Sequence, residues 1–443
     1  SSEETLAELL QFCKKNIVTR ISEITHLDKL RIPNYSAVLP GTEDSIWVYS
    51  GKGITNADAK ASAIMEAVER YSSLNSPSKK IIRGSYTDLL GSYGKVLHPD
   101  EVVEFVNPEF DDKNSITDFV VGFDLLNNEN VLVPAQIALS RFTPTAPAIQ
   151  IFPYFHTNGL ASGNVLEEAI YHALCEVIER DASSIADLCA SSIPYSILEQ
   201  IRESLSKPES GGYQINHIPA AEKFVDDANI FPLVDFSETL KDSDIIRRLM
   251  KRFTEAGVNL LIKDITQKDI GVPTFVASSI EWVTHNYGYF AKGYGTDINS
   301  KIALIRAITE VSQTRVVNIQ GARDDLKKIQ YKENDEIYKR KWAFMDMPFR
   351  SKDQKENRGK KKNVIKFHEI KTQNNNDILD DIKSILNRLK KAGLKRAIIV
   401  ELTDPKVGIP VVRAIVPGLE TFEVSESIMG VRAKKYFRNL HLK

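Results

Sequence analysis

Three stretches of the chain repeat one spacing of oxygen-bearing side chains behind an alanine. Ala63–Glu69, Ala173–Glu179 and Ala307–Gln313 all follow the pattern Ala-x-x-Glu-x-x-(Glu/Gln). Positions i and i+3 of a helix lie on one face, so each stretch presents a pair of oxygen ligands among apolar neighbours. Carboxylates in such surroundings need a cationic partner, and clustered oxygen ligands suit Mg²⁺. The repetition predicts one shared acidic site that binds a metal ion.

One such pair has an ordinary explanation as a solvated helix face or as half of an ion-pair ladder. Three copies behind the same small residue are harder to explain in that way. Further polar groups accompany the helices and could hold a phosphorylated ligand. They are Lys52 between two glycines, Ser62, His172, Arg306, Gln313 and Arg315.

Several polar groups on or near these helices also have a purely structural explanation. Gly51-Lys52-Gly53 can be a simple turn, and His172 can be a hydrogen-bonded core histidine. Arg70 and Arg180 can be ion-pair partners of a neighbouring helix. The sequence contains neither a Walker P-loop nor the kinase signatures, so a nucleotide site would be of another type.

The hydrophobic pattern predicts the elements that must position these groups, in a mixed α+β fold with several sheets. We expect helices at 3–16, 56–74, around 244–250 and at 378–389, besides the other two Glu motifs. We expect strands at 36–39, 45–50, 118–123, 131–133, 258–262, 271–278, 397–401 and 411–416. Each Glu helix follows a Gly-containing segment, and 157–164 and 293–297 are predicted to be loops.

The composition is that of an ordinary folded protein, with 42% hydrophobic and 26% charged residues among 443. A formal net charge of -1 gives no overall field toward nucleic acid or an acidic membrane surface. There is no apolar run of membrane-spanning length and no signal-peptide pattern, so we expect a cytoplasmic protein. The three cysteines fit neither a disulfide framework nor a paired-thiol zinc site.

The domain organisation that we predict centres on one large catalytic unit. Residues 1–50 supply an N-terminal helix and strands to the same unit, which continues over 51–420 as the domain that carries the three Glu motifs. A charged stretch at about 331–362 is expected to be a solvated insertion, with a basic docking patch as the alternative. Residues 421–443 are expected to be a C-terminal tail.

Four ordered segments of this sequence resemble the signatures of the YcaO family. They are Gly51-Lys52-Gly53 with 62–72, then 157–163 with 176–182, then 310–315 with 321–325, and finally 410–420. The early Thr19-Arg20-Ile21 also fits, so the resemblance covers about residues 19–420.

The resemblance implies a fold with a non-P-loop site for ATP and Mg²⁺ between the Glu-bearing helices. YcaO proteins use ATP to activate a backbone amide of a peptide or protein: a nucleophile adds to the amide carbon, the oxygen is phosphorylated, and phosphate leaves. By position, the metal would be bound by Glu66, Glu69, Glu176, Glu179 and Glu310. ATP would be bound by Arg20, Lys52, Ser62, His172, Gln313 and Arg315. The family also suggests a homodimer.

Two features of azoline-forming family members help to predict which product this protein forms. Azoline-forming members often have an E1-like domain and a proline-rich end, whereas this sequence ends Phe437-Arg-Asn-Leu-His-Leu-Lys443. We therefore expect a stand-alone, thioamide-forming type that uses sulfide on a protein such as methyl-coenzyme M reductase. Some enzymes of this type work with a TfuA partner that delivers sulfur.

Two other functions remain open on the sequence. One is an azoline-forming cyclodehydratase of a ribosomal peptide. The other is a nucleotide-binding accessory protein for another modifying enzyme, although a scaffold would not need intact Glu and Arg positions in all three helices. Loss of ATP turnover in Glu66→Gln or Glu179→Gln, without unfolding, would favour an enzyme.

Overall fold

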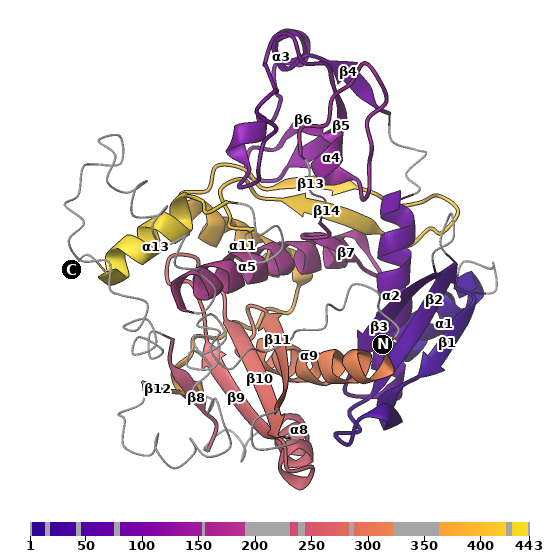
Figure 1. Ribbon diagram of the computed structural model, residues 1–443, viewed down its shortest axis with the longest axis vertical. Helices are drawn as coiled ribbons and strands as arrows, with labels where there is room; N and C mark the ends of the chain where they lie inside the picture. Colours follow the sequence, from indigo (N-terminus) through magenta and orange to yellow (C-terminus); the bar gives the residue numbers. More distant parts are fainter. Residues whose placement is uncertain are drawn as a thin grey trace.

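The computed structural model describes residues 2–13, 18–40, 46–74, 80–152, 156–190, 231–237, 244–282, 288–321, 363–421 and 428–441. The predicted insertion at 331–362 and the last part of the third signature, residues 322–325, lie outside the described residues. Within the described part of the chain the strands form three sheets, which Figure 1 shows together with the helices that cover them.

The first sheet is an antiparallel meander of β1 (Arg20–Glu23), β2 (Asn34–Pro40) and β3 (Ile46–Lys52). The second has the order β11 (Gly288–Thr296), β10 (Thr274–Trp282), β9 (Asn259–Asp264), β8 (Leu233–Asp235) and β12 (Val364–Lys366). The third has the order β4 (Ile82–Gly84), β5 (Thr117–Asp124), β13 (Ile398–Glu401), β14 (Val411–Ile415) and β7 (Leu160–Ser162). In addition, β6 (Glu129–Pro134) pairs with β5.

Three helices carry the Glu motifs: α2 (Asn56–Leu74), α5 (Leu166–Ala190) and α9 (Ser300–Gln320). The other described α-helices are α1 (Ser2–Cys13), α3 (Tyr86–Tyr93), α4 (Ala135–Ala138), α8 (Asp244–Glu255), α11 (Ile378–Lys391) and α13 (Val431–His441). The predicted mixture of helices and several sheets is confirmed, and the helices and strands expected from the pattern lie within a few residues of these bounds.

The apolar faces of these elements form three cores around the Glu helices. One core lies between α2 and the third sheet, a second joins α5 and α11 to β13 and β14, and a third lies between α8, α9 and the second sheet. On α5 the buried residues include Leu174, Val177 and Ile178, which surround the Glu motif on the same helix. The motif carboxylates therefore lie where cores meet, and burying them is costly unless they are paired.

The glycines before the Glu helices allow strand backbone to touch helix backbone. A Cβ at Gly51, in β3, would lie 2.0 Å from the backbone nitrogen of Ala63 in α2. A Cβ at Gly295, in β11, would lie 2.5 Å from the backbone nitrogen of Ala307 in α9. Such contact requires glycine on the strand and a small residue on the helix, which explains the alanine of the repeated motif.

The prediction of a loop over 293–297 is therefore wrong, because residues 293–296 are the end of β11. The segment at 157–164, also predicted to be a loop, contains the short strand β7. In both places glycine and small residues indicated a turn, whereas they serve close packing of a strand. The Gly-x-Gly segments thus belong to the scaffold that holds the helices.

The C-terminal helix α13 is linked to α5 by ion pairs. The Arg432 guanidinium of α13 pairs with Asp181 of α5 at 2.8 Å and with Asp269 at 2.6 Å. Asp181 is fully buried, so these charge-assisted contacts hold the helix firmly. None of the helices in the described residues combines the length and the apolar character that crossing a bilayer requires.

Candidate active site

The three Glu motifs meet around α5, which crosses the middle of the molecule in Figure 1. Helices α2 and α5 both pack on β7 and β14, while α9 packs on β3 and β11, and α5 also contacts β11. The electrostatic influence between motifs follows this packing. Glu176 of α5 contributes to raising the pKa of Glu69 on α2, and Glu310 of α9 does the same for Glu179 on α5. The structure thus brings the three motifs into one acidic site.

Glu69 faces the short strand β7. Its Oε1 accepts the backbone N–H of Ser162 at 3.0 Å and the Ser162 hydroxyl at 2.8 Å. Burial raises the pKa of Glu69 to about 7, with Arg70 opposing and Glu66 adding to the rise. The carboxylate is therefore held in a fixed orientation but is short of positive charge.

Arg70 and Arg180 pair within their own helices. Arg70 lies 3.5 Å from Glu66, and Arg180 lies 4.0 Å from Glu176, each four residues along the helix. Such i,i+4 pairs are weak at a surface and only loosely fixed at these distances. Burial still raises the pKa of Glu176, although Arg180 and Arg70 both lower it.

The third part of the site joins α5 and α9. Burial and the neighbouring Glu310 raise the pKa of Glu179 to about 7, against the opposing charges of Arg180 and Arg306. Burial also acts to raise the pKa of Glu310, but the ion pair with Lys52 outweighs it and the pKa is lowered. Lys52 therefore keeps one of two adjacent carboxylates ionised, while the other is poised near neutrality.

The structure gives the remaining predicted nucleotide ligands different surroundings. Gln313 follows Glu310 by one turn and donates to the Ser50 carbonyl, beside Lys52. Burial and Arg306 hold the pKa of His172 well below its ordinary value, so the imidazole is neutral at pH 7. Ser62 is half-buried on α2, one turn before Glu66.

Arg20 and Arg315 have partners elsewhere. Arg20 is exposed on β1, and its Nε donates to Ser22 at 2.8 Å. Arg315 is buried and makes a two-pronged pair with Asp28, with both distances 2.8 Å, and a further bond to Glu281 at 2.9 Å. Because Arg315 is five positions after Glu310, it points roughly 140° away around α9. The assignment of both arginines to ATP stays a prediction.

Sequence reasoning did not assign a role to Arg413 of β14, which completes the site from the sheet side. Its side chain is buried and burial lowers its pKa to about 10, while the charge of Glu176 is the largest influence that opposes this. Its Nε and Nη1 have no hydrogen-bond partner among the described residues. An arginine inside the apolar strand Val411–Ile415 is itself a signal, because an unpaired buried charge is costly.

Across the described residues, no three His, Cys, Asp or Glu side chains are grouped closely enough to hold a metal ion by themselves. The carboxylates are instead engaged by Lys52, Ser162 and the motif arginines. This arrangement fits Mg²⁺ bound together with phosphate oxygens, since protein carboxylates often supply just one or two ligands to such an ion. The buried Nη1 of Arg70, which has no hydrogen-bond partner among the described residues, provides a donor for an anionic oxygen. The side chains thus suit Mg²⁺ with a polyphosphate, and the metal-ligand assignment itself stays a prediction.

Known proteins align with this chain over most of its length. A protein from Methanothermobacter thermautotrophicus is 34% identical over 423 residues, covering 94% of this chain and 93% of the relative. A protein of the tfuA 3' region of Rhizobium leguminosarum bv. trifolii is 28% identical, covering 98% and 91%. Both relatives are themselves uncharacterized.

Solved structures share the fold at low sequence identity. YcaO from Methanopyrus kandleri, bound with AMPPCP and Mg²⁺, matches with a TM-score of 0.62 at 20% identity, covering 97% of this chain and 95% of that one. A heterocyclase in complex with substrate and cofactor matches with a TM-score of 0.66 at 21% identity. The match covers 92% of this chain but half the length of the heterocyclase chain.

The model of one family matches residues 50–222 and 227–420 of the chain. Its description is YcaO cyclodehydratase, ATP- and Mg²⁺-binding, so ATP and Mg²⁺ are the cofactors of the family. The matched residues include all three Glu motifs and the β14 arginine that meet around α5. The chain belongs to the YcaO family of ATP-dependent, amide-activating enzymes.

Proposed function

We propose that this protein activates a peptide backbone amide with ATP and Mg²⁺ and converts it to a thioamide with a sulfide donor. The observation that carries the proposal is the meeting of two Glu pairs and the Glu310–Gln313 pair with Lys52 and the buried Nη1 of Arg70 at one site. Cys175, a buried cysteine on α5, is poorly suited to be the nucleophile, because burial raises the pKa of its thiol far above its ordinary value. An attacking group from outside the protein agrees with this.

Bound ATP and Mg²⁺ would supply the phosphoryl group that turns the amide oxygen into a leaving group. The chain would contribute positioning and charge, which is how phosphoryl transfer is generally catalysed. Glu310, with the Glu pairs on α2 and α5, would hold the metal, and Gln313, Lys52 and Arg70 would hold phosphate oxygens. Ser162 fixes the orientation of Glu69. In the reaction, sulfide adds to the amide carbon, and the original oxygen departs as phosphate.

The choice of thioamide formation rests on the relatives. The Rhizobium relative is named for the tfuA region, which supports a TfuA-type partner that delivers sulfur. We propose that the substrate is a protein such as methyl-coenzyme M reductase, and that the enzyme works as a homodimer.

The test is mass spectrometry of a synthetic peptide spanning the glycine-containing segment of methyl-coenzyme M reductase. The peptide is incubated with the protein, ATP, Mg²⁺ and sulfide. We expect the mass change of one oxygen replaced by sulfur, dependent on both ATP and sulfide. An unchanged peptide, while calorimetry shows intact ATP binding, would contradict this substrate and direct the search to another protein or to a missing TfuA partner.

Azoline formation is the second candidate, favoured by the family description as a cyclodehydratase and by the likeness to a heterocyclase. It predicts loss of one water from a peptide that contains Cys, Ser or Thr, with no need for sulfide. A nucleotide-binding accessory role makes a third prediction: ATP turnover in Glu66→Gln would equal that of the wild type. The same mass and turnover measurements therefore separate all three functions.

A further inference from the structure

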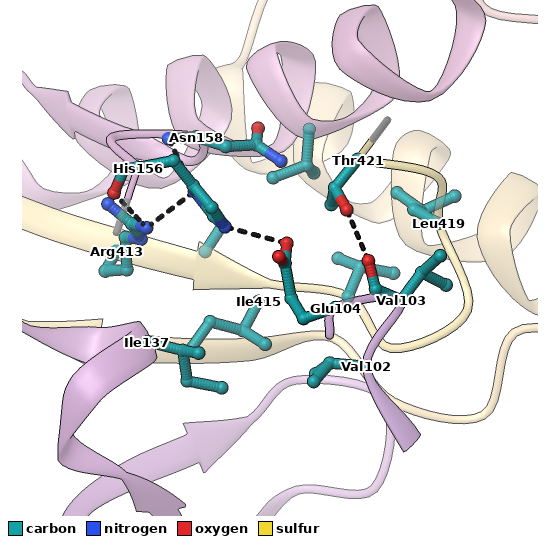
Figure 2. A pocket seen from close by; sticks show the side chains of 13 residues that line it. Val102, Val103, Glu104, Ile137, His156, Asn158, Arg413, Ile415, Leu419 and Thr421 are labelled. Atoms are coloured by element: carbon teal, nitrogen blue, oxygen red, sulfur yellow. Dashed lines mark hydrogen bonds and ion pairs between the residues drawn. The ribbon is translucent and has the colours of Figure 1, made fainter. Parts of the chain in front are cut away.

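A pocket lies beside the acidic site, on the other side of Arg413. Its lining comes from the segment around Glu104, from His156 and Asn158 before β7, and from β14 and the residues that follow it. Most other lining groups are apolar, including Val177, Ile415 and Leu419. Figure 2 shows His156 between Glu104 and Arg413, with the apolar side chains around them.

The hydrogen bonds of His156 fix the polar edge of this pocket. Its Nδ1 accepts from Arg413 Nη2 at 3.1 Å and from the Asn158 backbone N–H at 3.2 Å. The ring proton is therefore on Nε2, which donates to Glu104 Oε1 at 2.9 Å. Arg413 Nη2 also donates to the His156 carbonyl at 2.7 Å. One end of the guanidinium is thus committed to His156, and its orientation is set.

Two side chains on the pocket lining are buried with unused hydrogen-bonding atoms. Arg413 is 2% exposed, and among the described residues its Nε and Nη1 have no partner. Asn158 is 8% exposed, and in the same part of the chain its Oδ1 has none. Buried polar atoms without partners are rare and cost free energy, so a ligand that satisfies both kinds is strongly favoured.

Building on the proposed function, we infer that this pocket binds the backbone of the peptide substrate next to the amide that is activated. An amide presents one acceptor and one donor, so its C=O can take Arg413 N–H groups while its N–H donates to Asn158 Oδ1. A phosphate fits less well, because Glu104 and the Asn158 oxygen would repel an anion. The apolar lining suits a neutral peptide segment. Val177, which follows Glu176 on α5, is part of that lining, so the segment would lie next to the acidic site.

The inference can be tested without knowing the substrate, by titrating the full protein with N-acetylglycine N-methylamide. Selective ¹⁵N labelling of histidine makes the His156 ring a reporter inside the pocket. We expect saturable shifts of its signals, and about a fivefold or greater loss of affinity in Asn158→Ala and in Arg413→Lys, as for one lost hydrogen bond. The surface variant Lys383→Gln, whose side chain is 68% exposed, serves as the matched control.

The competing assignment gives Arg413 to the nucleotide. In that case Mg²⁺–AMPPCP would shift the same signals, Arg413→Lys would weaken nucleotide binding by about tenfold or more, and the small amide would not bind. Such a result overturns the inference. Thermal unfolding of each variant identifies one that fails to fold, and the wild-type titration decides independently of the variants. Amide binding without peptide-dependent ATP turnover would refute the proposed function and leave the pocket assignment standing.

Discussion

Two groups of charges lie on different sides of α9 and differ in how they are paired. On one side Arg315 joins Asp28 at 2.8 Å and Glu281 at 2.9 Å, and Lys29 adds a second contact to Glu281 at 2.6 Å. On the other side Glu310 is paired with Lys52 but lies next to Glu179, inside the acidic site. We call the first group the Arg315 cluster.

Burial acts to raise the pKa of carboxyl groups in both places, but cationic partners outweigh it at Glu281 and not at Glu69 or Glu179. Burial acts to raise the pKa of Glu281, but its bonds to Lys29 and Arg315 outweigh it and the pKa is lowered. In the acidic site burial prevails, and the pKa values of Glu69 and Glu179 are both raised to about 7. The comparison teaches that similar residue types do two jobs: the Arg315 cluster stabilises the fold, whereas the acidic site has negative charge that a bound cation would neutralise.

The largest effect is expected from breaking the Arg315 cluster. Asp28→Ala leaves a buried guanidinium without its two-pronged partner and should lower the free energy of unfolding by about 3–5 kcal/mol. Urea unfolding measures the loss, and ATP affinity of the folded variant should stay within about twofold of wild type. A loss below about 1 kcal/mol would contradict a structural role for the pair. A large change in ATP affinity would instead favour Arg315 as a nucleotide ligand.

Glu179→Gln should separate activity from stability. Removing this carboxylate takes away a proposed metal ligand, so peptide-dependent ATP turnover should fall by about 100-fold or more. The neutral amide also relieves the charge conflict with Glu310, so at pH 8 the variant should unfold at a higher temperature than the wild type. Glu401→Gln, at an exposed position of β13, is the control for both measurements. Lower stability at pH 8 would refute the assignment of unpaired charge to this residue.

The excess of negative charge in the acidic site should also make the stability of the protein depend on pH. Glu69 and Glu179 have folded pKa values of about 7, above the ordinary 4.5, so the folded state binds protons more tightly. The stability that these protons provide is complete below about pH 4.5 and is lost as the pH rises through 7. Mg²⁺ with ATP should replace the lost protons, so it should raise the unfolding temperature more at pH 8 than at pH 5. An equal rise at both values would mean that these carboxylates do not face the ligand.

The sequence predicted most of the elements and the acidic motifs, because both depend on local spacing. Hydrophobic periodicity located α2 and four strands of the third sheet, β5, β6, β13 and β14, but not β4 or β7. The i,i+3 rule placed Glu176 and Glu179 on one face of α5. What spacing could not predict was long-range pairing. The contact of Arg315 with Asp28 spans 287 residues of sequence, and nothing near either residue indicates it.

The errors have an equally physical origin. Gly295 was predicted to lie in a loop because glycine often marks turns, but here it lets β11 touch α9. The role of Arg413 depends on His156 and on its unused nitrogens, which become visible when the strands are assembled. Sequence spacing therefore identifies which residues carry charge, and packing decides which of those charges are already neutralised.

The smallest effect is expected at Arg20, which belongs to neither cluster. It is exposed on β1, and its Nε donates to Ser22 on the same strand. Because exposed polar contacts contribute little, Arg20→Gln should change the free energy of unfolding by less than about 0.5 kcal/mol. ATP affinity measured by calorimetry then tests the family-derived assignment independently of folding. A loss of about tenfold would show that β1 reaches the nucleotide. An unchanged affinity would confine the site to the three Glu helices, Lys52 and β14.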